Sequence, residues 1–152
     1  MEIVKFGLYN IYDSYFETYK DPHFSYNKNE NRPHYCGVKD SSDIIWMIPL
    51  SSKVEKYRKV IQREEKKYGN NGCIYYHILE IAGVERALLI GNMFPVKEHH
   101  IKKAFTINNV PYVLKNTYHT KSIDKKVKKY LSLVVRGKIK PHIDIMKIKR
   151  SL

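Results

Sequence analysis

The segment best suited to chemistry is Ser51-Ser52-Lys53, which follows the apolar run 46–50 and precedes a basic, helix-forming stretch. A helix N-terminus presents backbone N–H groups, and its dipole favours negative charge. Two hydroxyls and a lysine at such a junction therefore make a candidate phosphate site. The alternative interpretation is structural, with Ser51 or Ser52 capping the helix and Lys53 solvated.

Other groups could contact a phosphate or a base. Arg32 precedes a predicted strand, where its guanidinium could bind a phosphate in bidentate fashion; otherwise it is an exposed loop arginine. Tyr9, Tyr12 and Tyr15 could stack on unpaired bases, although such tyrosines usually pack in a core. Acid–base chemistry is also open, by residue type alone, to three histidines: His34, His99 and His119.

The sequence contains no convincing metal-binding spacing. Cys36 and Cys73 are not part of a C-x-x-C motif, and we expect them to be small, partly buried thiols. His99 and His100 are adjacent, so on a helix or strand we expect their rings to point in different directions. The carboxylates are scattered among lysines rather than clustered as a metal-dependent nuclease requires. We therefore expect no metal and no cofactor.

The charge of the chain points to a polyanionic partner. Twenty-eight Lys and Arg against fifteen Asp and Glu give a net charge of +13. Nucleic acid is the first partner this implies and an anionic membrane the second, whereas a lysine-rich, AT-biased genome would explain the charge without function. Segment 121–150 holds eleven basic and two acidic residues, and segment 51–67 holds seven and three.

A positive face built from these two segments predicts an RNA-binding surface. Its expected contacts are Lys56, Lys59, Arg63, Lys121, Lys125, Lys126, Lys128, Lys129, Arg136 and Lys138.

The length of 152 residues suggests one domain spanning 1–152. No apolar run approaches the roughly 20 residues that cross a bilayer, and the N-terminus lacks the apolar region of a signal peptide. We therefore expect a cytoplasmic protein without a membrane partner.

The elements that must position these residues follow from hydrophobic periodicity. The predicted strands are 3–8, 35–39, 44–50, 73–81, 85–90 and 93–96, with 40–43 as a hairpin loop. The predicted helices are 9–20, one from 54 to the turn 69–72, and one capped by Ser122 and ending at Gly137. The tail after 138 is ambiguous. This pattern predicts an α+β fold, with a small antiparallel, barrel-like curved sheet flanked by helices.

The segment WMIPLSSKVEKY resembles the strand-to-helix junction of type III toxin–antitoxin toxins, the ToxN/AbiQ/CptN group. The full form PLSSK is most similar to CptN-like members. The order of other features is similar too: Tyr9 on an N-terminal strand, RPHYCGV with Arg32 and Gly37, then LLIGNMFPV, and a helix ending in VVRGK. The resemblance covers roughly residues 1 to 140, and only PLSSK is specific.

The resemblance implies a fold like that of the small barrel RNases of the MazF/Kid type. It implies a metal-independent, sequence-preferring endoribonuclease, in which the 2′-oxygen of the substrate mRNA attacks and leaves a 2′,3′-cyclic phosphate and a 5′-hydroxyl. It also implies an antitoxin RNA of pseudoknot repeats that the toxin itself processes, a closed protein–RNA assembly, and a role in growth arrest and phage defence.

The family's site motif matches Ser51, Ser52 and Lys53. The resemblance implies phosphate stabilisation by Lys53, and hydrogen bonding or proton relay by the two serines; Tyr9 matches the N-terminal tyrosine. Arg32 stands where some relatives carry lysine, and arginine cannot act as a base. The family's later tyrosine corresponds to Tyr112 or Tyr118.

Segments 54–67 and 121–140 would hold the antitoxin phosphates. The alternatives are a non-catalytic RNA- or DNA-binding protein using the same surface, and a membrane-surface or ribosome-associated basic protein.

Overall fold

Strand β3 (Ile45–Ser51) is the strand around which the sheet is built. All of its residues except Ser51 are buried. It pairs with β2 (Pro33–Lys39) along one side, and on the other side with β6 (Phe94–Val96) near its start and β5 (Val84–Leu89) at its end. A strand that is buried on both faces needs apolar side chains at successive positions, and the continuous apolar run WMIPL meets this requirement.

The structure is a computed structural model that describes all residues 1–152. Its main sheet is antiparallel, with strand order β4-β5-β3-β2-β1-β7 and β6 paired to β3. The remaining strands are β1 (Leu8–Ile11), β4 (Tyr76–Ile81), β7 (Ile101–Ala104) and the two-stranded β8 (Thr106–Ile107) and β9 (Val110–Pro111). The predicted α+β class and antiparallel sheet are confirmed, but the sheet does not close into a barrel, because β4 and β7 remain edges.

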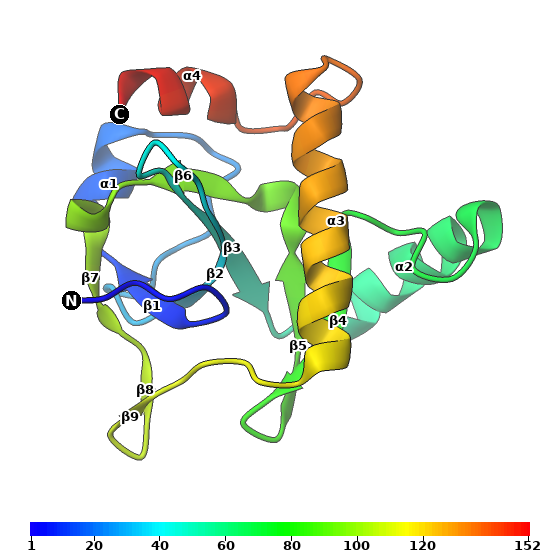
Figure 1. The fold of residues 1–152 in the computed structure, drawn as a ribbon, viewed down its shortest axis with the longest axis horizontal. Coiled ribbons are helices and arrows are strands. Elements are labelled where there is room, and N and C mark those ends of the chain that lie inside the picture. The colour runs from blue at the N-terminus through cyan, green and yellow to red at the C-terminus, as the bar shows by residue number, and fades with distance from the viewer.

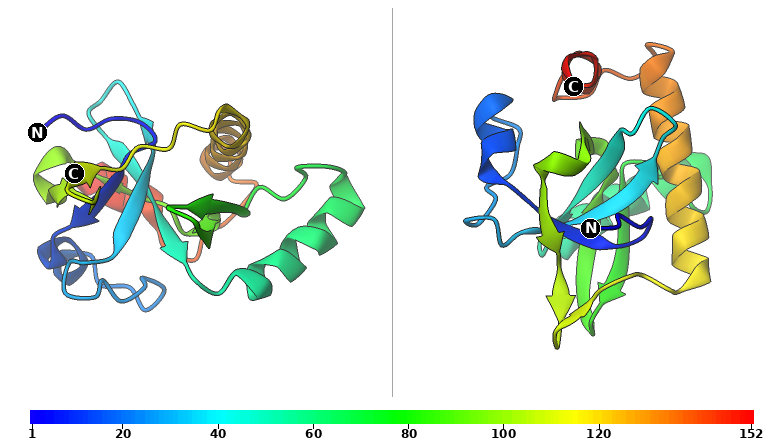
Figure 2. Two further views of the ribbon diagram at one scale, coloured as in Figure 1. Left: turned by 90° about the horizontal axis from the view of Figure 1, so that it is seen from below. Right: turned by 60° about the vertical axis from the view of Figure 1, so that its left-hand side comes forward.

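Four α-helices surround the sheet (Figure 1). They are α1 (Asp13–Thr18), α2 (Val54–Tyr68), α3 (Thr117–Val135) and α4 (Ile145–Ser151), with short 3-10 turns η1 (Ile90–Asn92) and η2 (Glu98–His100). Helix α3 runs across one face of the sheet, whereas α2 extends away from the body and has no buried residue (Figures 1 and 2). None of the helices is both long enough and apolar enough to cross a membrane.

Two predicted boundaries at the N-terminal half are wrong. Residues 3–8 were expected as a strand and 9–20 as a helix, but β1 spans Leu8–Ile11 and α1 begins at Asp13. The aromatic spacing that suggested a helix from Tyr9 is outweighed by strand pairing, since β1 is hydrogen-bonded to β2 on one side and β7 on the other. Tertiary pairing overrides a local helical pattern here.

The start of α3 is also earlier than predicted. Asn116 caps the helix, its side chain accepting a hydrogen bond from the N–H of His119. Ser122, the predicted cap, lies inside the helix, is buried and donates to Asn71 Oδ1 at 3.3 Å. The predicted apolar face holds at Ile123, Val127 and Tyr130, which are buried.

Candidate functional site

A cleft of about 620 Å³ opens where the end of β3 meets the start of α2. It contains every residue of the Ser51-Ser52-Lys53 segment. Side chains from the loop before β2, from β5, and from the chain around β8 complete it. Its polar wall consists of five cations, four hydroxyl groups and one amide: Lys28, Arg32, Lys53, Lys56 and Arg86; Ser25, Ser51, Ser52 and Tyr57; and Asn31.

The turn into α2 leaves its N-terminus without a side-chain cap. Ser51 Oγ accepts a hydrogen bond from the N–H of Lys53 at 3.1 Å, and the carbonyl of Ser52 accepts from Val54 N–H at 2.9 Å. Lys53 occupies the capping position, and no side chain caps the helix there. Ser51 therefore shapes the turn, and the first N–H groups of α2 can bind an anion in the cleft.

Arg32 ties the opposite side of the cleft to the end of β3. Its Nη2 donates to the carbonyl of Leu50, and its Nη1 donates to the carbonyl of Tyr26 at 3.3 Å. Its Nε is buried and has no hydrogen-bond partner. Burial lowers the pKa of this guanidinium, but an arginine remains a cation. A buried donor without a partner costs free energy, which a hydrogen-bond acceptor at Nε would recover.

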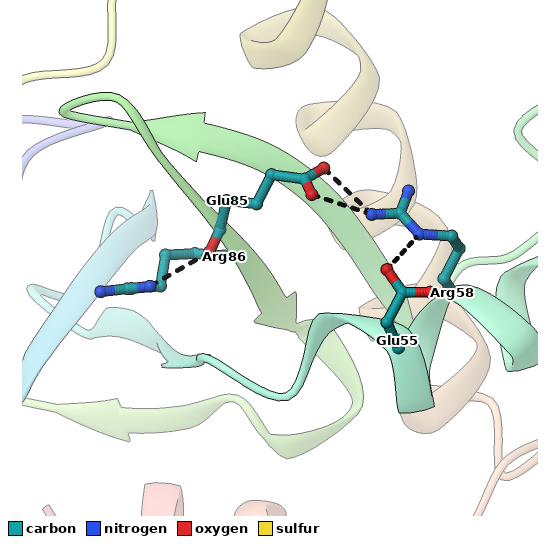
Figure 3. A network of polar contacts seen from close by, with 4 residues as sticks. All are labelled: Glu55, Arg58, Glu85 and Arg86. Carbon is teal, nitrogen blue, oxygen red and sulfur yellow. Dashed lines mark hydrogen bonds and ion pairs between the residues drawn. The ribbon is translucent and has the colours of Figure 1, made fainter.

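Arg86 comes from β5, and a polar network beside it ties that strand to α2 (Figure 3). Arg58 Nη2 contacts both carboxylate oxygens of Glu85, at 3.1 and 3.0 Å, and Arg58 Nε donates to Glu55 at 3.1 Å. Arg86 Nη1 donates to the carbonyl of Glu85 at 3.1 Å. These contacts fix the first turn of α2, which carries Lys53 and Lys56, against the strand that carries Arg86.

Neither a carboxylate nor a histidine lines the cleft. The cleft therefore holds five cations and no carboxylate to neutralise them, which favours a ligand with several negative charges. No group of three or more His, Cys, Asp or Glu side chains is arranged to hold a metal ion.

The tyrosines that the resemblance implies for the site, Tyr9 and Tyr112 or Tyr118, do not line this cleft. Tyr9 is buried, and its hydroxyl accepts from the N–H of Val4 at 2.7 Å. Tyr112 is half-buried beside the cleft, and burial raises its pKa although a hydrogen bond with the backbone of Ala82, a lining residue, partly offsets the shift. Tyr118 is exposed at the start of α3 and packs edge-on against His119.

The histidines proposed for acid–base work also lie elsewhere. His34 is buried, and desolvation lowers its pKa to about 3. His119 Nδ1 lies 2.8 Å from Nε2 of the buried His77. His99 is exposed on η2.

Most of the predicted RNA contacts are exposed, but Lys126 is not. Its Nζ is buried in the protein, 3.0 Å from Nδ1 of His77 and 3.4 Å from the carbonyl of Tyr76. Lys56 lines both the cleft and a shallow groove along α2 that includes Lys59, Arg63 and Lys66. The exposed basic residues on and beyond α3 form a separate set: Lys121, Lys125, Lys128, Lys129, Arg136 and Lys138.

Sequence reasoning missed Lys28 and Arg86 as members of the site. Both are single basic residues outside the basic segments, and no local pattern distinguishes them. Tyr57 lies within the helix predicted from 54 and was not singled out as a site residue, yet it lines the cleft and packs on Tyr76 with ring centroids 4.6 Å apart.

The fold is shared with two solved structures. One is ToxN, from a bacterial antiviral system regulated by a processed non-coding RNA; it matches with a TM-score of 0.64 at 14% identity over 95% of each chain. The other is AbiQ, a lactococcal anti-phage endoribonuclease of the type III toxin–antitoxin system, with a TM-score of 0.59 at 16% identity over 93% of this chain and 90% of AbiQ. No protein-family model and no curated protein matches the sequence. These likenesses establish a common fold.

Proposed function

We propose that the chain is an endoribonuclease toxin of a type III toxin–antitoxin system, in the group of ToxN, AbiQ and CptN. The observation that carries the proposal is the cleft, in which five cations and the PLSSK turn meet without a carboxylate. The shared fold with ToxN and AbiQ supports it, and so does the PLSSK motif.

The proposed reaction is cleavage by the substrate's own 2′-oxygen without a metal ion. The 2′-oxygen attacks the adjacent phosphorus, the bond to the 5′-oxygen of the next nucleotide breaks, and a 2′,3′-cyclic phosphate and a 5′-hydroxyl remain. The proton of the 2′-hydroxyl leaves as the 5′-oxygen gains one, so the net charge of the RNA is unchanged. Negative charge accumulates on the phosphorane oxygens, where preorganised cations act most strongly.

Within the cleft, Lys53 and Arg32 stabilise this charge in our proposal. Ser52 and the Ser51 hydroxyl, which already accepts the Lys53 N–H, hydrogen-bond the reacting phosphate or relay a proton. Tyr9, Tyr112 and Tyr118 do not line the cleft, so the present geometry favours the serines and cations over them.

The proposed partners are substrate mRNA and an antitoxin RNA of pseudoknot repeats, held in a closed protein–RNA assembly. A continuous row of cations, here called the cation track, supports this. Lys56 lines the cleft and also the groove along α2 that holds Lys59, Arg63 and Lys66. RNA that follows the track would place one phosphate in the cleft and others on α2. The basic residues of α3 offer a second surface for a folded RNA.

The test is expression and RNA cleavage by variants of the cleft. Lys53→Ala and Ser52→Ala should abolish toxicity and lower kcat by ~10²–10³-fold, the usual effect of removing one transition-state donor. Lys39→Ala is the matched control, because Lys39 is exposed at the end of β2, outside the cleft and outside both basic segments, and this variant should cleave as wild type does. Full activity of both cleft variants would refute the site.

Two further measurements separate the proposed chemistry from its alternatives. Cleavage should persist in excess EDTA, and a single 2′-deoxy nucleotide at the scissile position should block it. A protein that binds RNA with strong salt dependence but never cleaves it would instead be the non-catalytic binder. A short tandem repeat followed by a terminator directly upstream of the gene would favour the toxin interpretation.

A further inference from the structure

The cleft has a second wall of opposite chemistry to the cations. It is apolar, and two separate hairpins form it. Ile81 and Val84 flank the turn between β4 and β5, while Phe105 and Ile107 lie on the chain that enters the β8–β9 hairpin. The two hairpins extend from the same side of the sheet (Figures 1 and 2).

Part of this wall is left open to solvent. Val84 is 47% exposed, whereas Ile81 behind it is 7% exposed. The segment carrying Phe105 is held firmly, since its N–H donates to the carbonyl of Leu8 at 2.9 Å and its carbonyl accepts from Tyr112 at 3.0 Å. The wall is therefore an accessible apolar surface on a fixed backbone, and such a surface favours a flat apolar ligand over a charged one.

The two walls are joined through β5. Val84 and Arg86 are two residues apart in this strand, so their side chains point to the same face. Their separation along the strand is about 7 Å, within the span of one nucleotide. All four of Arg32, Arg86, Val84 and Ile107 line the same cleft, so a phosphate held by the two arginines would leave its neighbouring base within reach of Val84 and Ile107.

We propose that this wall, chiefly Val84 and Ile107, is a subsite for one unpaired nucleobase next to the phosphate that the cations hold. The inference rests on the proposed function and specifies its substrate as a single strand whose base is free to leave a stack. Aliphatic side chains offer no hydrogen-bonding pattern, so the subsite holds a base by its face rather than by its edge.

The experiment compares the Val84→Ala/Ile107→Ala double variant with wild type on a single-stranded RNA oligonucleotide carrying one mapped cleavage site. The base on each side of that site is removed in turn, leaving an abasic nucleotide. Val110→Ala is the matched control, because Val110 pairs with Ile107 in the same hairpin, is 63% exposed and does not line the cleft.

In wild type and in the control, the abasic nucleotide at one flank should lower kcat/KM by ~10-fold, the size of a typical base contact. The double variant should lose a similar factor on intact RNA and show no further loss with the abasic nucleotide. Equal abasic effects in the double variant and in wild type, or no effect at either flank, would overturn the subsite.

The same comparison is made on binding, with a 2′-O-methyl group at the scissile nucleotide to prevent cleavage. An abasic effect on Kd that disappears in the double variant supports the subsite even when no RNA is cleaved, in which case only the proposed endoribonuclease activity fails. If the RNA is cleaved, but the effects of the double variant and of the abasic nucleotide on Kd add to one another, the subsite is refuted and the proposed endoribonuclease activity stands.

Discussion

Acidification should destabilise the fold through two buried histidines. His34 is 2% exposed and His77 is 5% exposed. Desolvation, with added repulsion from Arg32 for His34 and from Lys126 and His119 for His77, lowers each pKa from 6.5 to about 3. Each imidazole is therefore neutral in the folded protein over a pH range in which it is protonated in the unfolded chain.

The sign and size of the effect follow from this difference. A histidine with a lowered folded pKa contributes stability that is complete above about pH 6.5 and is lost as the pH falls toward about 3. At about 1.36 kcal/mol per pKa unit, moving from about pH 7.5 to about pH 5.5 removes about 1.4 kcal/mol for each histidine. His34 and His77 together should lower the free energy of unfolding by about 3 kcal/mol.

The assay is denaturant unfolding at both pH values for wild type, His77→Gln and His99→Gln. Glutamine keeps a hydrogen-bonding side chain beside Lys126 and does not titrate, so the pH-dependent loss should shrink by the ~1.4 kcal/mol that His77 contributes. His99 is exposed, and its replacement should leave the loss unchanged. An identical pH dependence in His77→Gln and wild type would refute the reasoning about burial.

Two further substitutions test the packing around the sheet. A Cβ at Gly7 would lie 2.9 Å from Cε2 of the buried Tyr9 ring, so Gly7→Ala should destabilise by about 1–3 kcal/mol in denaturant unfolding; an unchanged midpoint would contradict the contact. Tyr130→Phe removes a donor to the carbonyl of Gly91 at 3.1 Å and should lower the free energy of unfolding by about 1 kcal/mol, measured in the same way; equal or greater stability would count against that bond.

The features that the sequence predicted well are local ones. The hairpin loop 40–43 is an example: Asp40 Oδ1 accepts hydrogen bonds from Ser42 N–H at 2.9 Å and Ile44 N–H at 3.1 Å. Asp is a common turn residue because its side chain makes such bonds. The junction at Ser51-Ser52-Lys53 is local in the same way, since the strand ends at Ser51 and the helix begins at Val54.

The rest of the cleft depends on strand register, which a single sequence does not encode locally. The pairing of Ser51 with Ala87 and Leu50 with Leu88 brings Arg86 beside the PLSSK turn. A shift of one residue would turn Arg86 to the other face of the sheet. Arg86 therefore joins the site through a contact between segments more than thirty residues apart, and only the fold reveals it.

Lys126 shows the opposite case, in which a signal was present in the sequence. Ile123, Lys126, Val127 and Tyr130 have the i, i+3, i+4, i+7 spacing of one helix face. That face packs on the sheet, so Lys126 is buried with the three apolar residues and its Nζ meets His77. The positive charge of the segment predicts a surface position for Lys126. Its spacing from Ile123 and Val127 on one helix face predicts the burial that is found.

The burial of His34 and His77 also bears on how activity should depend on pH. No histidine lines the cleft, and both of these stay neutral well below pH 6.5 because their pKa values are about 3. Any loss of cleavage between about pH 7.5 and about pH 5.5 should therefore parallel a loss of folded protein, because no histidine base in the cleft is there to be protonated. Antitoxin RNA binds only the folded form in our proposal, so it should stabilise the protein and move both losses to lower pH together. Activity that falls over this range while the protein remains fully folded would instead require a titrating group that acts on the reaction, and would contradict this reasoning.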